Sequence, residues 1–140
     1  MRQLYKPIVW FYGVSLLIVA SLRFIPWIND PQGNLFGVFH LDWLDDILHT
    51  GTGVWALVAV SQSRRWSEIY LIGIGALYFS DAVIGLIYGQ NPLHIGFWTG
   101  EPLYLTFLSR VLINGPHFFL GGFALLFGLH LRRQTFKNRV

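Results

Sequence analysis

The chain has 140 residues, a length typical of one domain. Only 12% of them are Asp, Glu, Lys or Arg, against roughly 25% in soluble domains, whereas 54% are hydrophobic and 17% aromatic. These proportions exclude a disordered chain and argue against a soluble globule, because a domain this small exposes much of its surface and needs charged groups to cover it. We therefore expect an integral membrane protein, with residues 1–140 forming a single transmembrane domain.

The sequence has no cysteine and a formal net charge of +3. The first property excludes disulfide exchange, thiolate metal sites, iron–sulfur clusters and thiol nucleophiles. The positive charge does not indicate nucleic-acid binding, because the Lys and Arg residues flank apolar segments and form no stripe along a polar face. Lipid headgroups of the bilayer are the expected partners of these cations, and no nucleic acid is expected.

Four apolar segments each approach the ~20 residues that a helix needs to cross ~30 Å of hydrocarbon. They run over residues 7–27, 42–62, 67–88 and 108–131, and stretches rich in proline and polar residues separate them. The sequence therefore predicts an all-α fold, an integral membrane four-helix bundle.

The distribution of Lys and Arg predicts how this bundle is oriented. The connections between the first and second helices and between the third and fourth contain no Lys or Arg. Cations are enriched on the cytoplasmic side of membrane proteins. We therefore expect both termini in the cytoplasm and the protein in a bacterial plasma (inner) membrane. The cations that define this side are Arg2, Lys6, Arg64, Arg65, Arg132, Arg133, Lys137 and Arg139.

An internal similarity links the second and fourth segments. When His49 is aligned with His117, a glycine, an aromatic residue, an alanine and a leucine also coincide. Two helices per unit would make the chain two parallel-repeat helical hairpins. Such a repeat predicts that the two histidines lie at equal depth on opposite sides of the bundle.

Several ionisable and polar side chains lie within the predicted helices, towards the outer face of the membrane. Charges inside hydrocarbon cost ~2.5–3.5 kcal/mol each at a helix centre, so they suggest function. We expect an outer-facing polar pocket formed from this set: Arg23, Asp42, Asp45, Asp46, His49, Tyr78, Asp81, Arg110, Asn114 and His117.

The first interpretation of this set is a cofactor site. Asp46 and His49 lie one helical turn apart, so a carboxylate and an imidazole share one face, as in the metal sites of helix bundles. Together with Asp81 and His117 they would bind a divalent metal ion. His49 and His117 alone would suit the axial ligands of a b-type haem. Either site requires His49, Asp81 and His117 to converge, with the other polar residues of the set as supporting partners.

A structural interpretation accounts for the same residues without a cofactor. Asp81 would pair with Arg23 or Arg110, either as a proton relay or only to fix packing. Asp42 or Asp45 would cap the second helix, and the histidines would hydrogen-bond across helices. His40 and His94 are expected in exposed outer loops.

The sequence offers little support for an enzyme. It has no Gly-x-Ser-x-Gly motif, and no serine lies within one helical turn of a predicted membrane histidine. Catalysis is left open, and a non-catalytic protein is favoured.

Three parts of the chain together resemble a known family. They are the segment Asn34-Leu-Phe-Gly-Val-Phe-His40, the segment from His49 to Leu57, and the residues Asn114, His117 and Gly121. It is a family of small four-helix bacterial integral membrane proteins of unknown function, with a Leu-Phe-Gly loop and His-bearing second and fourth helices. The resemblance covers most of the chain. It implies a topology and leaves the activity undefined.

Two functions remain as hypotheses. The first is a multi-pass membrane protein that binds a ligand, a metal ion or haem in the outer-facing polar pocket. The alternative is a non-catalytic accessory or assembly subunit of a larger membrane complex, which would dock other membrane helices or a second copy of itself.

Overall fold

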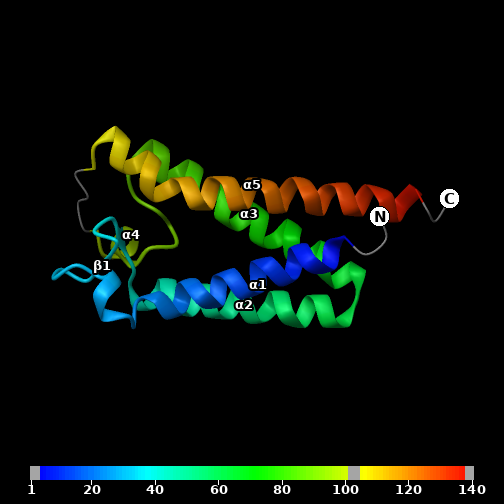
Figure 1. Cartoon of the computed structure of the whole chain (residues 1–140). Helices are drawn as coiled ribbons and strands as arrows, with labels where there is room; N and C mark the ends of the chain where they lie inside the picture. The colour runs from blue at the N-terminus through cyan, green and yellow to red at the C-terminus, as the bar shows by residue number, and fades with distance from the viewer. Residues whose placement is uncertain (1–3, 101–104, 138–140) are drawn as a thin grey trace.

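The computed structural model describes residues 4–100 and 105–137 (Figure 1). These residues are mostly helical, which confirms the predicted all-α class. In chain order the elements are α1 (Tyr5–Leu22), the 3₁₀ turn η1 (Pro26–Ile28), β1 (Asn34–Leu35), β2 (Phe39–His40), α2 (Trp43–Gln62), α3 (Arg64–Tyr88), α4 (Ile95–Thr99) and α5 (Phe107–Lys137).

The long helices pack in two antiparallel pairs, α1 along α2 and α3 along α5, and α3 also contacts α1 and α2 (Figure 1). The start of α1, the turn between α2 and α3, and the end of α5 lie together. We call this region the terminal end. The strands β1 and β2 and the short helix α4 lie at the opposite end, which we call the loop end.

Three of the described helices, α1, α3 and α5, are long and apolar enough to cross a membrane. These are three of the four predicted spans. The 20-residue α2 falls outside the set, although it runs along α1, because its first two turns contain Asp45, Asp46 and His49. The fold is therefore that of a helical protein with three clear membrane-span candidates.

The helix boundaries differ from the predicted ones by three or more residues in three places, one of which is the start of α3 at Arg64 in place of residue 67. The first helix was expected to reach residue 27, but α1 ends at Leu22. Ile25 is extended at φ −99° and ψ 105°, because the ring of Pro26 disfavours helical geometry in the residue before it. The last helix instead runs on to Lys137 and accommodates Pro116 in its interior.

The two connections at the loop end contain structure that the sequence pattern did not reveal. Antiparallel pairing of β1 and β2 places Leu35 opposite Phe39 in a small hairpin. Its turn includes Phe36 at φ 54° and Gly37 at φ 69°, so the Leu-Phe-Gly segment is the tip of this hairpin. The five-residue helix α4 lies in the connection before α5.

Glycines allow α3 and α5 to approach closely. A Cβ atom added to Gly121 would collide with the backbone nitrogen of Phe79, and one added to Gly75 would collide with the backbone of Leu125. Small residues of this kind let helix backbones pack at short distance. The close α3–α5 contact brings Asp81 on one helix within reach of His117 on the other.

Candidate functional site

A small polar cavity lies at the loop end. Its volume is about 90 Å³. Four of the five histidines of the chain line it, together with two acidic side chains. His49, Asp81 and His117 therefore line one cavity, although the group of described residues whose potential ligand atoms all lie within 4.8 Å of one another is Asp42, Asp45 and His94. The lining consists of Phe39, His40, Leu41, Asp45, His49, Asp81, Asn91, Leu93, His94, Ile113 and His117.

Asp81 and His117 form the central pair of this cavity. Asp81 is only 2% exposed, and its Oδ2 lies 2.9 Å from Nδ1 of His117. The same carboxylate accepts hydrogen bonds from the backbone N–H of Leu93 at 2.9 Å and from Nδ2 of Asn91 at 3.0 Å. A carboxylate surrounded by donors assigns the proton of His117 to Nδ1. In the neutral ring Nε2 then carries no proton, and its lone pair can coordinate a metal ion.

Packing fixes the plane of the His117 ring. Tyr78 stacks on it with ring centroids 4.6 Å apart and planes within 8°. The Tyr78 hydroxyl in turn lies 3.0 Å from Oγ1 of Thr52 on α2. The imidazole is thus held by a hydrogen bond at one edge and by an aromatic ring on one face.

His49 reaches the same cavity from α2. Its ring centroid lies 6.1 Å from that of His117. The residue is 7% exposed, and its buried Nδ1 forms no hydrogen bond of good geometry among the described residues, although the backbone of Asp45, one turn earlier on α2, interacts with the ring. Buried polar atoms without partners are uncommon in proteins. An imidazole in this state has bonding capacity that a ligand in the cavity would use.

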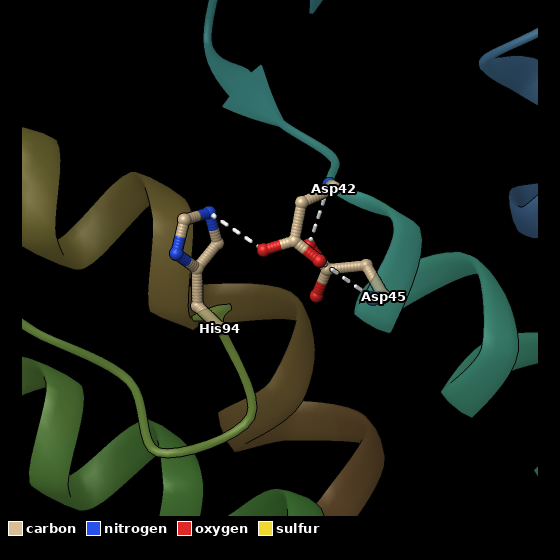
Figure 2. A group of neighbouring side chains, drawn as sticks. All are labelled: Asp42, Asp45 and His94. Carbon is tan, nitrogen blue, oxygen red and sulfur yellow. Dashed lines mark hydrogen bonds and ion pairs between the residues drawn. The ribbon is translucent and has the colours of Figure 1, made fainter. Parts of the chain in front are cut away.

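Asp42, Asp45 and His94 form a second group beside the cavity (Figure 2). Their potential ligand atoms all lie within 4.8 Å of one another. Asp42 and Asp45 make a capping box: Oδ1 of Asp42 accepts the N–H of Asp45 at 3.0 Å, and Oδ2 of Asp45 accepts the N–H of Asp42 at 2.9 Å. The capping interpretation of these two carboxylates is therefore confirmed.

Asp42 also joins α2 to the segment before α5. Its Oδ2 accepts the backbone N–H of Ile95 at 2.9 Å and lies 3.6 Å from Nε2 of His94. Burial raises the pKa of Asp42, but the backbone N–H donors of Asp45, Ile95 and Leu44 and the nearby His94 outweigh that effect. The pKa of Asp42 is lowered from its ordinary value, and the carboxylate stays charged as a cap.

His94 is poorly suited to bind a metal. Its Nδ1 accepts the backbone N–H of Gly96 at 3.1 Å and so caps α4. The proton of the neutral ring must then lie on Nε2, which faces Asp42 (Figure 2). Neither nitrogen offers a free lone pair while α4 is capped. Asp45 differs, because its Oδ1 forms no hydrogen bond among the described residues and its side chain lines the cavity.

The two arginines of the predicted set lie away from Asp81. Nη1 of Arg23 forms an ion pair with Oδ2 of Asp46 at 2.7 Å, because α1 packs against α2. Nη1 of Arg110 donates to the backbone oxygen of Ile87 at 3.2 Å. The expected pairing of Asp81 with Arg23 or Arg110 was wrong, since Asp81 pairs with His117.

Asp46 and Asn114, the other two residues of the predicted set, lie outside the cavity lining. Asp46 points towards α1 and is not among the residues lining the cavity. Asn114 is 1% exposed, receives a short hydrogen bond from Asn91 and donates to the backbone oxygen of Arg110 at 2.8 Å. Asn114 thus supports the Asn91 side chain that supports Asp81.

Sequence reasoning left three polar lining residues out of the site: His40, Asn91 and His94. Asn91 was read only as part of a polar connection, although it donates to both Asp81 and Asn114. His94 was expected to be exposed, but it is half-buried. The sequence carried no signal for His94, because it caps the five-residue helix α4, which leaves no periodic pattern. His40 is exposed as expected, yet it lines the cavity.

The comparison with protein families gives a clear result. Residues 8–129 match the family described as a domain of unknown function, DUF4383. The chain belongs to this family. No curated protein and no solved structure matches it. The membership confirms the predicted relation to an uncharacterised family, and the matched residues of this DUF4383 chain include the whole cavity lining.

Proposed function

We propose that this DUF4383 protein is a multi-pass membrane protein that binds a divalent transition-metal ion in the loop-end cavity. The observation that carries the proposal is the combination of an oriented His117, whose Nε2 is free, with a buried His49 that has an unpartnered nitrogen. Imidazole ligands suit zinc, copper, iron and nickel.

The proposed ligands are His117, His49 and the carboxylate of Asp45. Asp81 does not bind the metal in this arrangement. It accepts the other ring proton of His117, which fixes the tautomer and makes the imidazole a stronger ligand. Two imidazoles and one carboxylate would leave further coordination positions to water or a substrate.

The size of the cavity favours an ion over a haem. Pockets for larger organic ligands are roughly 300–1,000 Å³, whereas this cavity is about 90 Å³. A metal ion with bound water fits that space, and a porphyrin between the two histidines would require the helices to separate. A b-type haem therefore remains the weaker form of the proposal.

The proposed topology places α1, α2, α3 and α5 across a bacterial plasma membrane as a four-helix bundle. Six of the eight described Lys and Arg residues lie near the terminal end, all except Arg23 and Arg110: they are Lys6, Arg64, Arg65, Arg132, Arg133 and Lys137. The positive-inside rule then assigns that end, with both termini, to the cytoplasm. The loop-end cavity opens towards the outer surface, and the polar first turns of α2 lie near the outer interface.

The two helix pairs also support the proposed internal repeat. Each pair contributes one histidine, His49 from α1–α2 and His117 from α3–α5, at the same end of the molecule. The two rings face each other across the cavity, 6.1 Å apart, and are not separated on opposite sides of the bundle. A parallel duplication would make them equivalent ligands.

Metal binding can be tested on the purified full-length protein in detergent. After loading with Zn²⁺ and desalting, metal analysis should give about one ion per chain. His49→Ala and His117→Ala should each weaken binding by more than about 100-fold, since each removes a direct ligand. Asp45→Asn should weaken it less, because the amide oxygen still coordinates.

His130→Ala is the matched control. His130 lies on α5 like His117, but it is exposed at the terminal end and hydrogen-bonds Gln134 at 2.8 Å. This variant should bind Zn²⁺ like the wild type. If the His49→Ala, His117→Ala double variant still bound Zn²⁺, the metal site could not be this cavity. A protein that binds neither metal nor haem would leave the accessory-subunit hypothesis as the better one.

A further inference from the structure

A second cavity lies at the terminal end, on the side of the molecule where α3 meets α5. Its volume is about 590 Å³, and all of its lining residues come from these two helices. It shares no residue with the loop-end cavity. We call it the α3–α5 groove and define it by Arg65, Ile69, Ile72, Gly73, Arg132 and Phe136.

The charge of the α3–α5 groove is positive and uncompensated. Arg65 and Arg132 are exposed, and neither forms an ion pair or hydrogen bond with the described residues, although Arg132 lies 5.9 Å above the Phe136 ring. The acidic Glu68 at the base is buried and already paired with Arg64 at 3.2 Å. Two free guanidinium groups therefore face the groove.

The remaining wall of the groove is mostly apolar, with Thr135 as its other polar residue, and it continues onto exposed apolar side chains. Ile69 is 44% exposed and Phe136 is 58% exposed. Arg65 lies in the first turn of α3 and Arg132 near the end of α5, both candidate membrane spans. The arginines thus lie at the level where headgroups meet hydrocarbon, with an apolar channel leading from them into the membrane.

From this arrangement we infer that the α3–α5 groove binds an anionic phospholipid. The phosphate lies between Arg65 and Arg132, since guanidinium groups bind phosphate oxygens with two parallel hydrogen bonds. One acyl chain follows Ile69, Ile72 and Gly73. Basic pockets between helices on the cytoplasmic side recognise lipid headgroups in this way. The inference rests on the proposed membrane placement and is independent of the metal site.

The test uses the purified full chain in a neutral detergent and measures its thermal unfolding with three additives. Phosphatidylglycerol should raise the Tm of the wild type by about 2–4 °C through preferential binding to the folded state. Phosphatidylcholine and inorganic phosphate should each raise it by less than about 1 °C. The first comparison tests the charge of the headgroup, and the second tests the need for acyl chains.

Arg65→Gln with Arg132→Gln should abolish the response to phosphatidylglycerol, whereas Arg133→Gln should retain it. Arg133 is exposed on the same turn but lies outside the groove. Each single groove variant should lose part of the response, so the series remains informative if the double variant fails to accumulate. Equal shifts with both lipids, a full shift with phosphate alone, or a full response in the groove variants would each overturn the inference.

Discussion

The two ends of the molecule each bury one carboxylate of α3, but they satisfy it differently. At the terminal end Glu68 is 6% exposed and pairs with Arg64, a permanent cation, and with the hydroxyl of Thr135. At the loop end Asp81 is 2% exposed and pairs with His117, whose Nε2 forms no hydrogen bond with the described residues. The Glu68 carboxylate is satisfied by protein groups, although it lies in the wall of the α3–α5 groove, whereas the cluster at the loop end leaves an imidazole nitrogen unused.

This difference refines the usual inference from buried charge. An ionisable side chain inside a membrane helix suggests function by default. Glu68 shows that such a residue can be accounted for by packing, because its hydrogen bonds hold α3 to α5. A functional site needs bonding capacity that the protein itself leaves unused, beside a space for a ligand. Among the described residues, the loop-end cavity with His49 and His117 meets that condition, and so does the α3–α5 groove with Arg65 and Arg132.

The largest effect is expected from Asp81→Ala. The substitution leaves the N–H of Leu93, the amide of Asn91 and Nδ1 of His117 without their acceptor in a buried site. Removing one partner from a buried charged network costs about 3–5 kcal/mol. Urea unfolding in detergent should show this loss. Asp81→Asn, which keeps the shape and one acceptor oxygen, should lose less stability but weaken Zn²⁺ binding by about 10–100-fold. Unchanged metal affinity in Asp81→Asn would show that Asp81 does not support metal binding.

Glu68→Ala breaks the corresponding cluster at the terminal end. We expect a loss of about 2–3 kcal/mol, because hydrogen bonds to charged groups are lost while Arg64 keeps the backbone oxygen of Leu131 as an acceptor. Unfolding in urea measures this loss. Zn²⁺ affinity should stay within about twofold of the wild type, since the variant does not touch the loop end. A large fall in Zn²⁺ affinity would show that the two ends are coupled. It would contradict the view that the Glu68 cluster only stabilises the fold.

The parts of the fold that follow local pattern were predictable. Long apolar stretches identify α1, α3 and α5, because a helix that crosses hydrocarbon must be apolar over its length. The capping role of Asp42 could also be read from its place before α2. The hairpin β1–β2 and the short α4 were missed, because strands of two residues and a helix of five leave no periodic signal.

The site was predictable in its members but not in its pairings. Spacing alone put Asp46 and His49 on one face, yet the structure turns Asp46 towards Arg23 and Asp45 towards the cavity. Which carboxylate faces inwards depends on where α1 packs against α2, and local sequence does not encode that. His94 meets Asp42 only because a connection distant in sequence folds back over the start of α2.

Gly85→Ala tests the support of the loop-end cluster with a smaller effect. A Cβ at this position would collide with Oδ1 of Asn114 and approach Nδ2 of Asn91 at 2.5 Å, displacing the amides that hold Asp81. Overpacking should cost about 1–2 kcal/mol after the gain in helix propensity. Gly51→Ala is the control, because nothing lies within 4 Å of its Cβ position, and it should stabilise α2 by about 0.5–1 kcal/mol. Urea unfolding of both variants measures the contrast, and equal effects would contradict it.

Asp42→Asn should produce the smallest effect, visible only as a change in pH dependence. Asparagine caps a helix about as well as aspartate, so stability near pH 7 should change by less than about 1 kcal/mol. The pKa of Asp42 is lowered from 3.8 in the folded protein, so its charge stabilises the fold above that pH and the benefit is lost as the pH falls through 3.8 and below. Asp45 and His94 face Asp42 in both proteins, so the comparison isolates the Asp42 carboxylate. The wild-type advantage over Asp42→Asn should therefore shrink between about pH 5 and pH 3, as measured by urea unfolding at each pH. A constant difference would show that the carboxylate acts there only through its shape.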